Sequence, residues 1–179
     1  MKIVELPRSW RGRALIITNV SNPESWFAPE EIAIVESFAR PKRRAEWMIS
    51  RIAEKELRRQ GASGDFVSFS HSGGYAAAAV DVRPIGIDVE VLREIKEAAA
   101  HLFLSDDEAA AMRRCTIEHR MLHFWSAKEA AWKQLGGTPS TLKRVPLELL
   151  SEEKDGLRFD RAETFATGNL IAALTLPTS

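Results

Sequence analysis

The stretch Pro84-Ile85-Gly86-Ile87-Asp88-Val89-Glu90 decides how the rest of the chain is interpreted. Apolar residues alternate in it with Gly86, Asp88 and Glu90, which is the period-two pattern of a β-strand. On a strand, Asp88 and Glu90 point the same way and lie roughly 6–7 Å apart. Two such carboxylates repel one another unless a cation lies between them, and hard oxygen ligands suit Mg²⁺ or Mn²⁺. The alternative is a half-exposed strand with two solvated acids.

The composition is that of a globular chain without a dominant charge. The chain has 179 residues, 45% of them hydrophobic, which suits one domain or two small lobes with a real core. Lys plus Arg and Asp plus Glu both number 25, so the charge does not indicate a nucleic-acid or membrane partner. The single cysteine, Cys115, excludes an internal disulfide and a cysteine-based zinc cluster. With no signal-peptide pattern and no apolar run long enough for a bilayer, we expect a cytoplasmic protein.

The first half is predicted to contain a strand, two helices and paired strands. The first strand covers residues 13–18. One helix begins at Pro29, a residue suited to the first helical position, and a basic helix over 42–60 follows the break at Pro41. Two further strands, 66–70 and 75–82, are joined by a glycine-containing turn. We expect residues 66–90 to form a three-stranded antiparallel meander.

The second half repeats this order of elements. Ser105 and Glu108 form a capping-box pattern at the start of a helix. The other elements predicted there are helices over 94–101 and 116–135 and strands over 145–150, 157–159 and 169–176. The sequence therefore predicts an α+β fold of two pseudo-symmetric lobes, each a small antiparallel sheet packed on helices, with residues 1–84 in one lobe and 85–179 in the other.

A second informative stretch is Trp125-Ser126-Ala127-Lys128-Glu129-Ala130-Ala131-Trp132-Lys133. On a helix, Glu129 and Lys133 lie one turn apart on the same side. An ordinary Glu–Lys pair at i,i+4 accounts for this spacing without any chemistry. Alternatively, Glu129 joins Asp88 and Glu90, and the three carboxylates with neighbouring lysines hold a divalent metal on a pyrophosphate.

Together with Ser70-His71-Ser72-Gly73, these stretches resemble the 4'-phosphopantetheinyl transferase superfamily, specifically its monomeric two-lobed type, which activates peptide and polyketide synthetases. The family pattern is an Ile/Val-Gly-Ile/Val-Asp-Ile/Val-Glu strand, preceded by Ser-His-Ser-Gly and followed by Trp-Ser/Thr-x-Lys-Glu-Ala/Ser-x-x-Lys. Residues 85–90, 70–73 and 125–133 match these elements in order and spacing. The chain is short at 61–65, where many relatives carry a longer loop with Gly-Lys-Pro.

The resemblance implies an activity. The 4'-phosphopantetheine arm of coenzyme A would be transferred to a serine of an apo acyl or peptidyl carrier protein, with release of 3',5'-ADP. The reaction would require Mg²⁺, with Mn²⁺ as a substitute, and coenzyme A would bind in the cleft between the lobes of a monomer. Two other classes stay open: a catalytically silent module that binds coenzyme A or a carrier protein, and a metal-dependent pyrophosphate hydrolase.

The resemblance also implies roles for individual residues at the reacting phosphates. Asp88, Glu90 and Glu129 would bind the metal, with Asp88 also close to coenzyme A. Lys128 and Lys133 would contact the phosphates, and Lys133 would assist the chemical step.

Further roles concern the nucleotide and the catalytic base. The side chains expected at the ribose 3'-phosphate are Ser70, His71, Arg44 and Arg51. Glu129 is the first candidate for the base that deprotonates the carrier serine. Glu108 is a second candidate, because it aligns with a family carboxylate, although a capping-box glutamate belongs at the same position.

Overall fold

The computed structural model describes residues 1–177, whose strands form two antiparallel sheets packed with helices. The first sheet has the order β1 (Lys2–Ile3), β2 (Ala14–Thr18), β4 (Tyr75–Asp81), β3 (Phe66–Ser72). The second has the order β5 (Ile87–Val91), β9 (Leu170–Thr175), β8 (Ala162–Thr167), β7 (Gly156–Phe159), β6 (Leu149–Glu153). The α-helices are α1 (Pro29–Glu36), α2 (Pro41–Arg59), α3 (Asp106–Arg114) and α4 (Arg120–Gln134). The predicted α+β class is confirmed.

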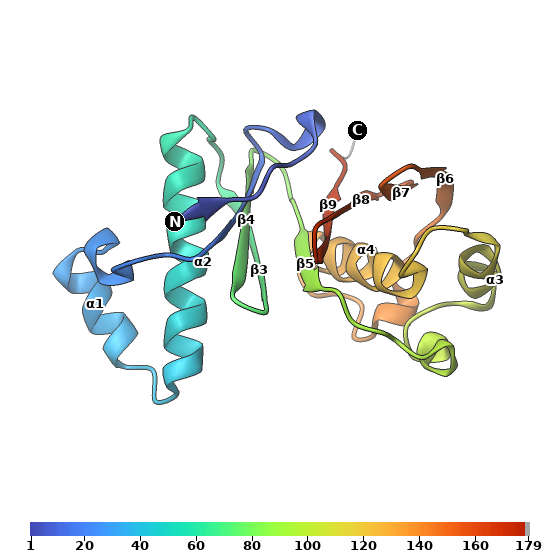
Figure 1. Ribbon diagram of the computed structural model, residues 1–179, viewed down its shortest axis with the longest axis horizontal. Helices are drawn as coiled ribbons and strands as arrows, with labels where there is room; N and C mark the ends of the chain where they lie inside the picture. Colours follow the sequence, from blue (N-terminus) through green and yellow to red (C-terminus); the bar gives the residue numbers. More distant parts are fainter. Residues whose placement is uncertain (178–179) are drawn as a thin grey trace.

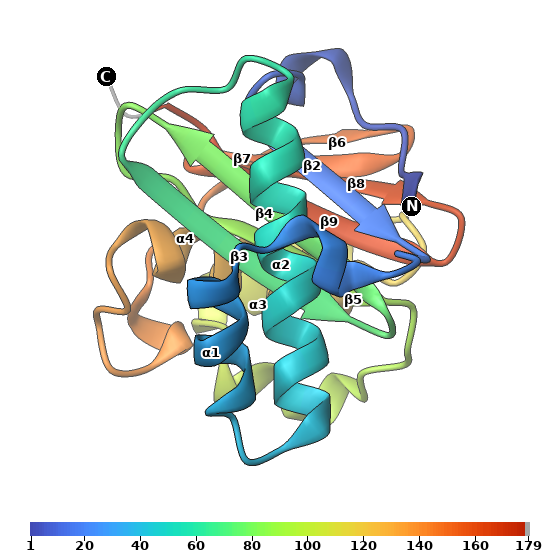
Figure 2. The same cartoon turned by 90° about the vertical axis from the view of Figure 1, so that its left-hand side faces the viewer.

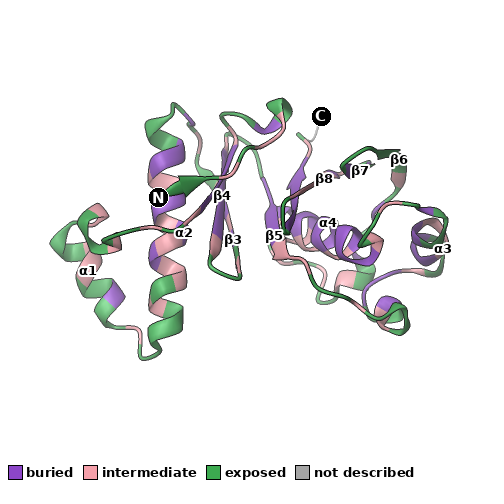
Figure 3. Ribbon diagram, viewed as in Figure 1, coloured by how far each residue is buried: buried purple, intermediate pink, exposed green. Residues whose placement is uncertain are grey.

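The elements stack in layers, with α1 and α2 outermost, then the two sheets, then α4 and α3 (Figure 1). Figure 2 shows α1 and α2 lying across the outer face of the four-stranded sheet. Buried residues gather on the sides where the layers face one another (Figure 3), and three apolar clusters fill the spaces between α2 and the first sheet, between the sheets, and between the second sheet and α3–α4.

The strand β4 shows how close this packing is. Ala76 and Ala78 belong to the cluster against α2, whereas Ala77 and Ala79 belong to the cluster between the sheets, and all four are fully buried. This alternation follows from the two-residue period of a strand. Small side chains on both faces therefore let a helix and a second sheet approach the same strand.

The predicted three-stranded meander is wrong at its third strand. β3 and β4 form a hairpin through Gly73 and Gly74, both with positive φ, but β5 pairs with β9 in the other sheet, Asp88 lying opposite Ala173. The free edge of β4 is taken by β2 instead. β3 also extends two residues further than the predicted strand, so His71 lies on a strand rather than in a turn.

The second half differs from prediction mainly at its boundaries. The capping box of α3 is confirmed, since Ser105 Oγ accepts the Glu108 N–H at 3.3 Å and Glu108 Oε2 accepts the Ser105 N–H at 2.7 Å. α4 begins later than expected because His119 adopts a left-handed conformation, with φ of 54°. The helix expected over 94–101 is the 3-10 helix Glu97–Leu102. The strands β1 and β8 were not predicted, and β6 begins later than expected.

Each sheet is built from one continuous half of the chain, with β1 to β4 in the first sheet and β5 to β9 in the second. Strands of the first sheet end at Asp81 and those of the second begin at Ile87, so the predicted boundary between 84 and 85 falls in the connection. That boundary stays a prediction. In the part of the chain that the structure describes, every helix is too short or too polar to span a bilayer.

Candidate active site

The strand β5 and the helix α4 bring two of the sequence motifs into direct contact. A Cβ on Gly86 would lie 1.9 Å from the carbonyl oxygen of Ala130, so the strand can approach the helix only with a glycine here. Lys133 Nζ donates to Asp88 Oδ1 and to the Ile87 carbonyl oxygen, both at 2.9 Å. Residues 85–90 and 125–133 therefore build one site.

The carboxylates of β5 are held by several donors. Asp88 is buried, and its Oδ1 accepts from Ser70 Oγ at 2.9 Å as well as from Lys133. Its other oxygen, Oδ2, is buried without a hydrogen-bond partner among residues 1–177. Glu90 accepts from Ser72 Oγ through Oε2 at 3.1 Å, and from Trp125 Nε1 through Oε1 at 3.1 Å. One buried oxygen of Asp88 is thus left without a partner among the described residues.

Glu129 lies in the same electrostatic neighbourhood. Burial raises the pKa of its carboxyl group, and the negative charges of Asp88 and Glu90 raise it further, while the Lys133 ammonium lowers it. These influences require the three carboxylates and Lys133 to be close enough to interact. The cations beside the three carboxylates are Lys133 and Arg93, which pairs with Glu90 at 3.2 Å, so the carboxylates outnumber the cations by one.

These residues suit a divalent cation in chemistry but are not converged on one. Within residues 1–177, no set of three or more His, Cys, Asp and Glu side chains is arranged to bind a metal ion. The donors are nevertheless carboxylate oxygens of the kind that Mg²⁺ and Mn²⁺ prefer. The buried Oδ2 of Asp88 needs a partner, and a cation would relieve the repulsion that raises the Glu129 pKa. The donor set therefore fits such an ion once the side chains converge.

The structure separates Lys128 from this group. Its side chain is 0% exposed, and its ammonium lies 2.6 Å from Glu108 Oε1 and donates to the Val145 carbonyl oxygen. Burial lowers the pKa of Lys128, and the Glu108 carboxylate opposes that change. A fully buried ammonium engaged in this way cannot reach a phosphate, so the geometry does not support the expected phosphate contact of Lys128.

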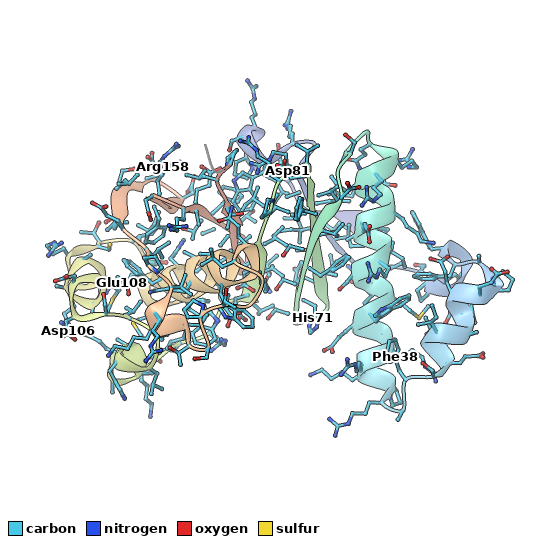
Figure 4. All side chains as sticks on the ribbon, turned by 180° about the vertical axis from the view of Figure 1, so that it is seen from behind. Phe38, His71, Asp81, Asp106, Glu108 and Arg158 are labelled. Atoms are coloured by element: carbon cyan, nitrogen blue, oxygen red, sulfur yellow. The ribbon has the colours of Figure 1, made fainter. Side chains whose placement is uncertain are left out.

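Glu108 is likewise engaged inside the fold. Beyond its cap to Ser105 and its bond to Lys128, Glu108 Oε1 accepts the Leu147 N–H at 3.1 Å. Figure 4 labels Glu108 in the outer part of the C-terminal half, well apart from His71. This position does not support Glu108 as a catalytic base, and the capping interpretation is the one that the contacts bear out.

A basic pocket of about 800 Å³ lies between α2 and the end of β3. Its ionisable lining residues are Arg40, Lys42, Arg43, Arg51, His71 and Glu46. Arg51 stacks over Phe69, its guanidinium carbon 4.4 Å from the ring centre, and pairs with Glu54 at 2.9 Å. His71 Nδ1 lies 3.7 Å from Glu46 Oε1. The excess of cations makes the pocket suited to an anionic ligand.

Of the four residues expected at the ribose 3'-phosphate, two line this pocket and two do not. His71 and Arg51 line it, whereas Ser70 points to the opposite side of β3, toward Asp88. Arg44 donates instead to the Glu36 and Phe38 carbonyl oxygens at the end of α1, at 3.2 and 3.5 Å. Lys42 and Arg43 also line the pocket but were not predicted as phosphate-binding residues. The cluster of basic residues at the start of the 42–60 helix was the sequence signal that could have identified them.

The comparisons with known proteins fall on this region. A sequence model described as the 4'-phosphopantetheinyl transferase superfamily matches residues 84–169. The 4'-phosphopantetheinyl transferase psf-1 of Bacillus pumilus is 39% identical over 72 residues, which are 38% of this chain and 31% of that protein. The chain thus aligns with about a third of that relative's length. The resemblance to the superfamily that the motifs predicted is confirmed over the matched residues, which include β5 and α4.

Proposed function

We propose that this chain, similar over residues 84–169 to 4'-phosphopantetheinyl transferases, transfers the phosphopantetheine arm of coenzyme A to a carrier protein. The observation that carries the proposal is the bond between Lys133 and Asp88. It joins the Gly-Ile-Asp-Val-Glu strand and the Lys-Glu-Ala-Ala-Trp-Lys helix into a single acidic site. The acceptor would be a serine of an apo acyl or peptidyl carrier protein.

The reaction makes and breaks one phosphorus–oxygen bond. The serine hydroxyl oxygen of the carrier attacks the β-phosphorus of coenzyme A, the bond from that phosphorus to 3',5'-ADP breaks, and the serine proton passes to a base. We assign the base to Glu129, the carboxylate of α4 that interacts with Asp88, Glu90 and Lys133. Lys133 would stabilise the negative charge that develops on the leaving phosphate.

Asp88, Glu90 and Glu129 are the proposed ligands of a divalent cation, Mg²⁺ or Mn²⁺. Such an ion neutralises the pyrophosphate and stabilises its charge during transfer. The free oxygen of Asp88 and the excess of negative charge support this assignment. Within the protein, Lys133 and Ser70 hold the other oxygen of Asp88 and so keep the free one in a defined orientation.

The basic pocket is the proposed site of the ribose 3'-phosphate. Arg51 and His71 would bind it together with Lys42 and Arg43, which line the same pocket. Coenzyme A would then extend from α2 across the junction of the sheets to β5 and α4, with residues 1–84 and 85–179 acting as the two lobes. A single copy of the chain would suffice, because the residues invoked all belong to it.

The test is intact mass spectrometry of apo acyl and peptidyl carrier proteins incubated with the chain, coenzyme A and Mg²⁺. We expect each accepted carrier to gain the mass of one phosphopantetheine arm, and EDTA to prevent the gain. The variants Asp88→Ala and Glu129→Ala should each slow the gain by at least about 100-fold. Binding of coenzyme A without transfer would instead favour a silent binding module, and its breakdown without a carrier would favour a hydrolase.

A further inference from the structure

Three serines of β3 meet β5 along the line where the two sheets adjoin. Their hydroxyl oxygens accept backbone N–H groups of β5, always from a residue 19 positions later in the chain. The bonds run from the Ile87 N–H to Ser68 Oγ (3.1 Å), from Val89 to Ser70 (3.2 Å) and from Val91 to Ser72 (3.2 Å). We call this set the serine ladder. The constant offset means that β3 and β5 run parallel, linked by hydroxyls where a sheet would use carbonyl groups.

The position of β5 explains why these hydroxyls are needed. β5 is the edge strand of its sheet, and its other side pairs with β9. The outward N–H groups of Ile87 and Val89 are in the buried zone between the sheets and require acceptors. Ser68 and Ser70, which are 7% and 8% exposed, supply them. Each rung therefore has a structural task.

Two of the three rungs also bond to a carboxylate. Ser70 Oγ donates to Asp88 Oδ1 at 2.9 Å, and Ser72 Oγ donates to Glu90 Oε2 at 3.1 Å. Ser68 makes only its backbone bond among the contacts of residues 1–177. A hydroxyl that accepts a backbone N–H has its orientation restricted, so its own proton is aimed at a defined oxygen.

We propose that Ser70 and Ser72 are positioning residues, which fix the carboxylates of Asp88 and Glu90 in the orientation that the proposed transfer requires. The inference rests on the proposed function. Ser70 and Lys133 both occupy Oδ1 of Asp88, which leaves Oδ2 as the oxygen for a ligand. Because the serines belong to one sheet and the carboxylates to the other, the ladder makes the geometry of the site depend on how the two sheets meet.

The chain provides a matched control for this proposal. Ser68→Ala, Ser70→Ala and Ser72→Ala each remove one backbone acceptor, but only the last two also remove a carboxylate bond. We expect all three variants to lower the unfolding temperature, Ser72→Ala least, because its bond to the Val91 N–H is only partly buried. Relative to Ser68→Ala, the other two should lose at least about tenfold in kcat and about tenfold in Mn²⁺ affinity, measured by electron paramagnetic resonance of free Mn²⁺. Ser72→Thr, which keeps the hydroxyl, should recover most of the loss.

The outcomes separate this proposal from the proposed function. Equal kcat and equal Mn²⁺ affinity in all three alanine variants would overturn the positioning role and leave the ladder as a structural link. If the wild-type chain neither transfers nor binds Mn²⁺, the proposed function fails, and crystal structures of the variants decide the positioning role. It holds if Asp88 turns away in Ser70→Ala and Glu90 in Ser72→Ala but neither moves in Ser68→Ala; carboxylates unmoved in all three variants overturn it.

Discussion

Two lysines of α4 each pair with a carboxylate of another element, and the two pairs differ in their surroundings. Lys128 pairs with Glu108 at 2.6 Å, with the two side chains 0% and 9% exposed. Lys133 pairs with Asp88 at 2.9 Å, and its side chain is 22% exposed. The first pair is surrounded by further bonds to Val145 and Leu147, whereas the second leaves Asp88 Oδ2 without a partner.

The difference teaches what separates a pair that stabilises a fold from a pair that can bind a ligand. In the Glu108 pair, both ions are buried and bonded to further partners inside the protein, which leaves little capacity for an additional one. In the Asp88 pair, the lysine side chain is partly exposed and a buried carboxylate oxygen lacks a partner, so the pair can still engage a further charged group. Exposure and satisfied bonds distinguish the pairs, and residue type does not.

Breaking the buried pair should have the largest effect on stability. Lys128→Met leaves the Glu108 carboxylate buried without its counter-ion, which should lower the free energy of unfolding by about 3–5 kcal/mol. Urea denaturation measures this. The double variant Lys128→Met with Glu108→Gln should recover part of the loss, because the uncompensated charge is gone. A single variant within about 1 kcal/mol of the wild type would show that the pair is not structural.

Breaking the pair of Lys133 and Asp88 should act mainly on transfer. Lys133→Met should lower kcat by about 10²–10³-fold, because the charge on the leaving phosphate loses its ammonium. The free energy of unfolding should also fall, because Asp88 is buried, but by less than in Lys128→Met, since Lys133 is partly exposed and Ser70 still donates to Asp88. The carrier mass-gain assay and urea denaturation, applied to both lysine variants, give the comparison. Equal ratios of activity loss to stability loss would contradict the distinction between the two pairs.

The sequence already indicates that Lys128 and Lys133 lie on different sides of α4, although the resemblance implied the same phosphate-binding role for both. Five residues advance a helix by about 500°, which places Lys128 and Lys133 about 140° apart around α4. One site on one face cannot use both. Glu129 and Lys133, four residues apart, do share a face. The positive charge of Lys133 lowers the pKa of Glu129, which agrees with that prediction. Helical geometry therefore favours Lys133 over Lys128 as the neighbour of Glu129, and the phosphate-binding role of each lysine stays a prediction.

The sequence also predicted the positions of most helices and strands, but not which strands are neighbours. Period-two and helical patterns located β2 to β5 and α1 to α4 within a few residues, because they report which side chains are buried. They do not report which strand is the neighbour, so the partner of β5 was assigned wrongly. The alternating serines 68, 70 and 72 were a visible signal that this face of β3 meets polar groups. Which groups these are depends on the approach of two sheets, a long-range feature that local pattern does not contain.

The contact between β5 and α4 can be tested through Gly86. In Gly86→Ala the new Cβ would overlap the Ala130 carbonyl oxygen, so strand and helix must separate. We expect a loss of about 1–3 kcal/mol in the free energy of unfolding, together with a fall in kcat as Lys133 and Asp88 move apart. Gly61→Ala is the control, because its Cβ meets nothing within 4 Å and only its positive φ strains the backbone. It should lose stability without losing kcat; a parallel fall in both variants would mean that the contact does not set the site.

The smallest expected effect is a change in the pKa of Glu129, which reports the charges of the site without any substrate. Lys133→Met should raise this pKa further, because the ammonium that lowers it is removed. Asp88→Asn should lower it, because a negative charge that raises it is neutralised. Glu108→Gln should leave it unchanged, since Glu108 belongs to the other pair.

Carbon-13 nuclear magnetic resonance of the glutamate side chains follows the titration of Glu129 in each variant. Shifts of the same sign in Lys133→Met and Asp88→Asn would show that these two residues do not share a site with Glu129.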